Sequence, residues 1–241
     1  MRFRNFQHLR LFAFLMGLLC FSGTTGFGYE KGEAAKSSTA ATNPYRLSSR
    51  LASGMNGLTF WSGISFDSPA GRFFGAIADR EFIIIGLQYG KIIAANRFVA
   101  LEYTCDFIPV AMVTKNPRNE IVTFRTPNGD SFSVARIRRT SVYGVGLAPV
   151  GWRFYAWQSK PVRLFLSVSA GFLTFLDEVP LPDARKFNFT FDFGGGVQLL
   201  SRSRWAVTLG YKLHHLSNAN TAPVNPGLDA NIFYLGISSF R

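Results

Sequence analysis

Residues 187–199 read FNFTFDFGGGVQL, and they alternate strictly between two kinds of side chain. The odd positions carry four phenylalanines followed by Gly195, Val197 and Leu199, whereas the even positions carry Asn, Thr, Asp, Gly and Gln. Successive side chains of a β-strand point to opposite faces of its sheet, so this stretch predicts a strand with one apolar and one polar face.

The same alternation recurs along the rest of the chain. It is clearest in residues 205–217 and 99–107. Weaker alternation predicts five further strands, which makes eight in total. These five span residues 58–66, 82–89, 141–154, 162–175 and 231–240.

The connections between these strands are alternately short and long. The long ones are residues 67–81, 110–140, 176–186 and 218–229. Outer-membrane barrels have short periplasmic turns and long external loops, and a barrel of eight strands has a lumen that side chains can fill. The sequence therefore predicts an all-β protein, an eight-stranded antiparallel outer-membrane β-barrel with its phenylalanine-rich faces toward lipid and its glycine-rich polar faces toward the lumen. A soluble β-sandwich also alternates, but usually with more charge.

The composition agrees with a barrel and excludes two other classes. Of the 241 residues, 17% are charged and 15% aromatic, with 25 Phe and 23 Gly. A disordered chain has few aromatic and many charged residues. A mean hydropathy of +0.12 is too low for a bundle of transmembrane helices, each of which needs about 20 apolar residues.

The N-terminus has the layout of a secretory signal. Arg2, Arg4 and Arg10 precede an apolar run over residues 11–21, and small residues follow at 22–26. We expect a signal peptide over residues 1–28, a flexible N-terminal segment over 29–57 and a β-barrel domain over 58–241. Removal of the signal lowers the net charge from +12 to +9.

Removal of the signal also removes one of the two cysteines, Cys20. Cys105 is then the only cysteine, so neither an intramolecular disulfide nor a cysteine metal cluster is expected. We predict no metal and no cofactor.

The end of the strand at residues 205–217 carries the most informative side chains. If both termini are periplasmic, this end lies at the external surface. Parity places His215 and Ser217 on the lipid-facing side and His214 in the lumen. A serine two residues from a histidine on one strand face is within reach of the hydrogen bond that activates a hydroxyl nucleophile. Asp229 shares the outward parity of the next strand, where it can orient the imidazole.

Spacing alone allows two interpretations of this cluster: a catalytic site, or polar residues without a function. Serine, histidine and asparagine are ordinary residues at strand ends and at membrane interfaces. A polar group on a lipid-facing wall nevertheless costs free energy, so its presence there favours a functional role.

The motif formed by these residues resembles that of a known family. His-Leu-Ser-Asn-Ala at 215–219, Asn-Pro-Gly at 225–227 and the acid Asp229 are similar to the outer-membrane lipid A deacylases, the lipid A 3-O-deacylase or acyloxyacyl hydrolase family. The resemblance is strongest over residues 205–240. It implies an eight-stranded barrel with a Ser-His-acid triad on its outer wall.

The same resemblance implies a role for each residue of the motif. Ser217 would be the nucleophile, His215 the general base and Asp229 the acid that holds His215. The best-known members have Glu at the acid position, one methylene longer than Asp229. Asn218, which follows the nucleophile, is the candidate oxyanion donor.

Basic residues concentrate in the long connection 110–140. Arg136, Arg138 and Arg139 are candidates to bind the phosphates of lipopolysaccharide, because arginine binds phosphate with two parallel hydrogen bonds. The alternative is an external loop that is simply polar and basic. The other basic residues are scattered without a recognition motif, so we expect no nucleic-acid partner.

These observations lead to one main hypothesis and two alternatives. The main one is a serine esterase that hydrolyses a fatty acyl ester of lipid A, embedded in the outer membrane of a Gram-negative-type bacterium. A non-enzymatic small barrel with a structural or lipid-binding role is the first alternative, and hydrolysis of phospholipid esters is the second. The sequence leaves open a homodimer and the acyl position that is cleaved.

Overall fold

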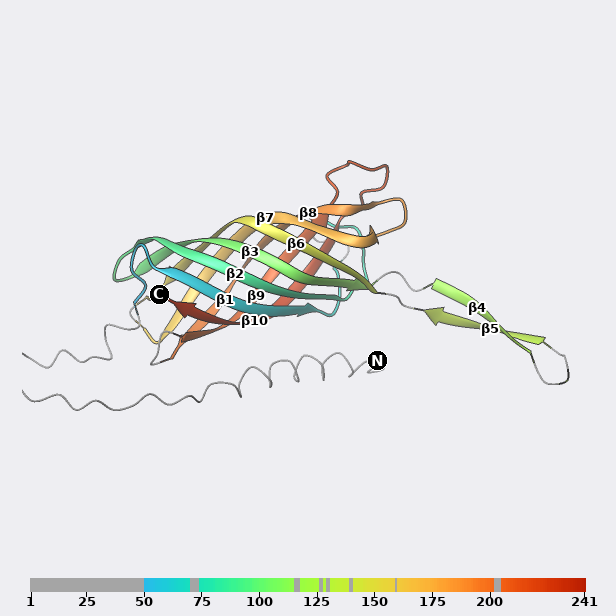
Figure 1. Cartoon of the computed structure of the whole chain (residues 1–241), viewed down its shortest axis with the longest axis horizontal. Coiled ribbons are helices and arrows are strands. Elements are labelled where there is room, and N and C mark those ends of the chain that lie inside the picture. The colour runs from blue at the N-terminus through green and yellow to red at the C-terminus, as the bar shows by residue number, and fades with distance from the viewer. Residues whose placement is uncertain are drawn as a thin grey trace, which may run out of the picture. The chain divides into compact units, whose positions relative to one another are not determined.

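Eight strands of the computed structural model close into an antiparallel barrel, in the order β1-β10-β9-β8-β7-β6-β3-β2 (Figure 1). The structure describes residues 50–69, 74–114, 118–125, 128, 131–138, 141–158, 160–201 and 205–241. The barrel strands are β1 (Asn56–Ser65), β2 (Phe82–Ala95), β3 (Val99–Thr114), β6 (Ser141–Ala156), β7 (Val162–Val179), β8 (Arg185–Leu200), β9 (Trp205–Ser217) and β10 (Leu228–Phe240). The predicted fold class is confirmed.

The two faces of each strand are separated as the alternation predicts. On β8, Phe193 is 56% exposed on the outer wall, whereas Asn188 and Gln198 are fully buried inside. Large exposed hydrophobic side chains continue around the outer wall on the other strands. An apolar exterior around a polar interior is the arrangement of a transmembrane β-barrel and the reverse of a soluble sandwich. Within the described ranges, no helix is long and apolar enough to cross a membrane.

Several strands are longer than predicted because β-bulges interrupt their alternation. β3 continues to Thr114, beyond the predicted end at residue 107, and its register with β6 shifts between Ile108 and Ala111. A bulge adds one residue to a strand and so reverses the parity of the residues that follow. β7 likewise runs to Val179, so the predicted long connection 176–186 is mostly strand.

The connection after β3 contains a feature that the sequence analysis did not predict. β4 (Arg118–Arg125) and β5 (Ser131–Arg138) pair as a separate two-stranded sheet. In both sequences the odd and the even positions each mix apolar with polar or basic residues, so their period-two hydrophobic signal is weak.

The predicted N-terminal boundaries fall partly outside the described residues. The predicted signal peptide and residues 29–49 belong to the undescribed part. β1 begins at Asn56, two residues before the predicted boundary, and Leu51 is 4% exposed with its N–H donating to Gln158 Oε1 at 2.7 Å. The end of the segment predicted to be flexible therefore packs onto the barrel.

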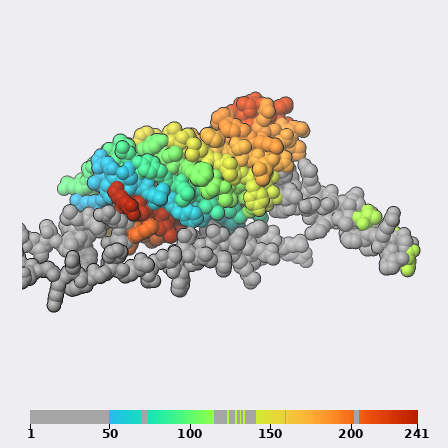
Figure 2. All heavy atoms as spheres, viewed as in Figure 1, coloured from blue at the N-terminus to red at the C-terminus, as the bar shows by residue number. Residues whose placement is uncertain are grey.

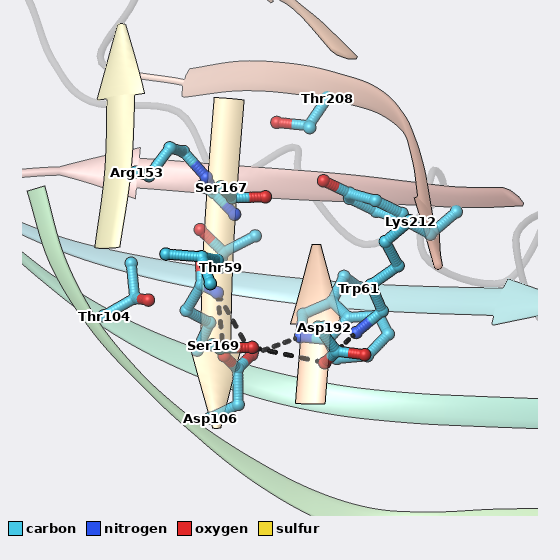
Figure 3. A pocket seen from close by; sticks show the side chains of 14 residues that line it. Thr59, Trp61, Thr104, Asp106, Arg153, Ser167, Ser169, Asp192, Thr208 and Lys212 are labelled. Carbon is cyan, nitrogen blue, oxygen red and sulfur yellow. Dashed lines mark hydrogen bonds and ion pairs between the residues drawn. The ribbon is translucent and has the colours of Figure 1, made fainter. Parts of the chain in front are cut away.

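The lumen is filled by hydrogen-bonded polar side chains (Figure 3). Trp61 Nε1 donates to Asp106 Oδ1 at 2.7 Å, and Gln88 Nε2 donates to both oxygens of the same carboxylate. Lys212 Nζ lies 3.0 Å from Asp192 Oδ2. The remaining cavity has a volume of about 30 Å³, room for about two water molecules.

A second buried ion pair lies further along the lumen. Arg153 Nη1 is 3.6 Å from Glu102 Oε2, and the hydroxyl of Tyr155 donates to the same oxygen at 2.8 Å. The guanidinium also lies over the ring of Phe165, with 4.9 Å between its Cζ and the ring centroid. These charges are buried together, so each depends on its partner.

The loop after β9 and the β7–β8 turn lie side by side at one end of the barrel (red and orange in Figures 1 and 2). Arg185 joins them, because its Nε and Nη2 donate to the carbonyl of Thr221 at 3.1 and 2.8 Å. This end also carries the segment between β1 and β2. Ser217 and Asp229 lie here, where β9 ends and β10 begins.

Candidate active site

The two adjacent histidines of β9 face opposite sides of the barrel wall. His214 is 1% exposed in the lumen, with its Nδ1 2.6 Å from Asp192 Oδ1. His215 faces outward with its side chain 18% exposed, and its Nδ1 is 2.7 Å from Asp229 Oδ1. The structure therefore holds two His–Asp pairs on one strand, one toward the interior and one toward lipid.

The strand register brings His215 and Asp229 together. In the β9–β10 pairing, Asp229 lies directly opposite His215. On its other side, His215 pairs with Phe191 of β8. Directly opposite residues of antiparallel strands have Cβ atoms about 5 Å apart, which suits a short carboxylate against an imidazole. A side chain as short as Asp is thus sufficient to reach Nδ1.

The Asp229 carboxylate is enclosed although it lies on the outer face. It is 0% exposed, and its Oδ2 accepts hydrogen bonds from the backbone N–H groups of Phe74 and Gly75 at 3.0 and 2.9 Å. His215 Nδ1 lies 2.7 Å from Oδ1, so a proton on Nδ1 would be shared with this oxygen and would leave the lone pair of the imidazole at Nε2.

The donors to Asp229 belong to a segment of the β1–β2 connection, residues 74–77, which we name the strap. The N–H of Ala76 donates to the carbonyl of Pro226 at 2.8 Å, and Ile77 forms a parallel bridge with Leu228. The strap was not predictable from the sequence, because backbone donors leave no side-chain signature. Gly75 is the one residue that could have indicated a close backbone contact.

Ser217 continues the outer face of β9, two residues beyond His215. It lies opposite Phe189 of β8, and its position is about 7 Å along the strand from that of the histidine. Among the described residues its hydroxyl makes no hydrogen bond. Its position on the same face as His215 agrees with the expected parity, and its role as nucleophile stays a prediction.

Asn218 is buried and organises the loop after β9. Its N–H donates to Asn225 Oδ1 at 3.0 Å, and its Nδ2 donates to the carbonyl of Val224 at 2.8 Å. Its own carbonyl accepts from the N–H of Thr221 at 3.1 Å. These bonds use the backbone N–H and one amide hydrogen, so a role for Asn218 as an oxyanion donor stays a prediction.

The remaining candidates are not tested by the geometry. Arg136 and Arg138 are residues of β5, and Arg139 lies outside the described residues. Their binding of phosphate also stays a prediction. In the part of the chain that the structure describes, no group of three or more His, Cys, Asp or Glu could hold a metal ion.

Fold and site together define a class of protein: a membrane β-barrel whose outer wall carries a His–Asp pair next to a serine. Residues 123–238, which include β5 to β9 and the paired His215 and Asp229, match the family model of the lipid A 3-O-deacylases (PagL). Over this region the chain is similar to that family, and the predicted resemblance is confirmed. The apolar wall and the family match place the barrel in the outer membrane and support lipid A deacylation as its function.

Two further comparisons describe how the chain relates to known proteins. The crystal structure of the outer membrane enzyme PagL aligns with a TM-score of 0.49 and 13% sequence identity, over 74% of this chain and 97% of that chain. No curated protein matches the sequence. The comparisons give no support for a homodimer.

Proposed function

We propose that this protein is a serine esterase that removes an ester-linked fatty acyl chain from lipid A. The observation that carries the proposal is the His215–Asp229 pair, 2.7 Å apart on the lipid-facing wall, with Ser217 two residues away on the same face. Nucleophile, base and orienting acid are the three groups that acyl transfer through a serine requires.

The proposed reaction has two steps. In the first, Ser217 Oγ attacks the ester carbonyl while its proton passes to His215 Nε2. The C–O bond to the sugar breaks, the sugar oxygen takes the proton from Nε2, and an acyl-enzyme remains. In the second, water gives a proton to Nε2 and attacks the acyl carbonyl, which releases the fatty acid and restores the serine hydroxyl. Asp229 stays ionised throughout and stabilises the imidazolium.

The position of the site on the outer wall suits a lipid substrate. Pockets for small molecules usually have volumes of about 300–1,000 Å³, far above the lumen cavity of about 30 Å³. That cavity therefore has no room for an acyl chain. On the wall, the ester of a lipid in the surrounding leaflet reaches Ser217 by lateral diffusion.

Basic residues would complete substrate binding. We propose that Arg136, Arg138 and Arg139 bind the phosphates of lipid A. Support comes from their residue type and from their place in the connection between β3 and β6, which leaves the barrel at the same end as the site.

Mass spectrometry of lipid A from cells that produce each variant tests the proposal. We expect the wild-type protein to remove one acyl chain and Ser217→Ala to leave lipid A intact, since loss of the nucleophile lowers kcat by about 10⁶-fold in serine hydrolases. The matched control is Ser141→Ala. Ser141 is an exposed serine on β6, and its variant should behave as wild type.

Each other outcome has a defined meaning. If the wild-type protein removes no chain that Ser217→Ala leaves, the lipid A esterase proposal is wrong. Incubation of the purified protein with defined phospholipids then separates the two alternatives. Release of fatty acid would show a phospholipid esterase, and no release would favour the non-enzymatic barrel.

A further inference from the structure

The strap makes contacts that the proposed reaction does not by itself require. Its two consecutive N–H groups, those of Phe74 and Gly75, both donate to Asp229 Oδ2. We propose that the strap positions the acid of the site and that Gly75 is the residue that permits this. The inference rests on the proposed function for its effect on catalysis, but the contact itself can be tested without activity.

The surroundings of Asp229 explain why such donors are needed. The carboxylate lies on the wall that faces lipid and is 0% exposed, so no bulk water solvates it. A buried charge is strongly unfavourable unless it is paired and hydrogen-bonded. His215 contacts only Oδ1 of the carboxylate, and the two N–H groups of the strap donate to Oδ2. Without the strap Oδ2 would have no hydrogen-bond partner and the carboxylate would turn away from the imidazole, which removes its use as the orienting acid.

The geometry at Gly75 allows no other residue there. A Cβ at this position would lie 2.6 Å from the backbone N of Asp229 and 2.9 and 3.0 Å from the C and Cα of Leu228. These atoms belong to the backbone of β10 and cannot rotate aside as a side chain can. Any side chain at position 75 therefore lifts the strap away from Asp229 and lengthens both hydrogen bonds.

A second glycine lies beside both the strap and the imidazole. Gly227 has a φ of +64°, which favours glycine, and a Cβ there would lie 3.1 Å from His215 Cε1 and 3.3 Å from Gly75 Cα. The strap, the turn before β10 and the imidazole thus touch one another directly. The ring of Phe74 lies beside the imidazole, with 5.4 Å between its centroid and that of His215 and an angle of 66° between the planes.

The test is Gly75→Ala in the full chain, examined by NMR and by kinetics. His214 and His215 each hold an Nδ1 near an aspartate, at 2.6 and 2.7 Å, so ¹⁵N-labelled histidine reports both pairs at once. We expect Gly75→Ala to move the His215 resonances and to leave those of His214 in place. The kcat should fall about 10- to 100-fold at nearly constant KM, because misplacement by about 1 Å can lower a rate 100-fold.

The control substitution is Gly236→Ala on β10, the strand that also carries Asp229. An added Cβ there would lie 3.3 Å from Phe60 O, Thr59 Cγ2 and Trp61 Cβ, so these neighbours would move by only a few tenths of an ångström. Gly236 is about 23 Å along the strand from Asp229, so both His signals and the kcat should stay at wild-type values. The proposal is overturned if Gly75→Ala leaves the His215 signals unchanged. It is also overturned if the signals of both histidines move together, since the effect would then be a general loosening of the barrel.

Failure of the proposed function looks different from failure of this inference. If the wild-type protein is inactive on lipid A, the kinetic comparison disappears but the NMR comparison does not. Selective movement of the His215 signals would then still show that Gly75 positions Asp229, in a protein whose reaction is another one.

Discussion

Replacement of Asp229 by Asn retains the size of the side chain and removes its charge. In the wild-type protein Oδ2 accepts from two backbone N–H groups and Oδ1 faces His215 Nδ1. Asn has only one side-chain oxygen. The two N–H groups of the strap need an acceptor, and an NH₂ group only donates, so the oxygen of Asn will stay at the Oδ2 position. The NH₂ of the substituted side chain must therefore face His215.

This exchange has a specific chemical consequence. An NH₂ group donates, so it forces Nδ1 of His215 to accept and moves the imidazole proton to Nε2. In this tautomer Nε2 cannot take the proton of Ser217. The corresponding change in serine proteases lowers kcat by about 10⁴-fold, which is about 5.5 kcal/mol in the activation free energy. We expect a decrease of the same order, with the barrel folded because every strap donor keeps an acceptor.

The assay is the release of fatty acid from lipid A in mixed micelles, normalised to the folded fraction by heat-modifiable migration on gels. Asp192→Asn is the matched control, because the same exchange then affects the His–Asp pair that faces the lumen. It should retain most of the activity. Retention of more than about a tenth of kcat in Asp229→Asn would refute the role of this acid. Equal losses in both variants would show that the site is not confined to the outer wall.

Two further predictions concern the two faces of the barrel wall. His215→Ala should lower kcat about 10⁴-fold or more, whereas His214→Ala should keep most of the activity. The opposite result would mean that the lumen-facing His214, and not the outward-facing His215, is the catalytic base. Arg153→Leu leaves the buried Glu102 without its cation and should lower the free energy of unfolding by about 3–5 kcal/mol. Urea titration of the barrel in lipid vesicles measures this loss, and a change below about 1 kcal/mol would contradict the ion pair's importance.

Much of the fold follows from the sequence because each side chain of a strand reports the face on which it lies. In β8 and β9 the alternation is uninterrupted, and the pairing of β9 with β10 has no register shift. Parity therefore carries without error from Leu209 to His215 and from Phe233 back to Asp229. The outward direction of these two residues was predictable for this reason, together with their proximity.

The errors have equally definite physical causes. The bulges of β3 near Ile108 reverse the parity, so the predicted strand ended too early. The strap was not predictable, since its hydrogen bonds come from the backbone and join residues as far apart as Phe74 and Asp229, 155 positions along the chain. The bonds of Asn218 within its loop were missed because its side chain was interpreted only as a donor to substrate.

The pairing of β1 with β10 is the seam at which the first and the last strand of the barrel meet. The strap follows β1, and Asp229 lies in β10, so the bonds between them cross this seam. A chain whose last strand has not yet paired with its first has Ser217 and His215 on β9 but lacks the donors that enclose the acid. Under the proposed function, the capacity to hydrolyse lipid therefore requires a barrel that is closed at this seam, and an open barrel would be inactive.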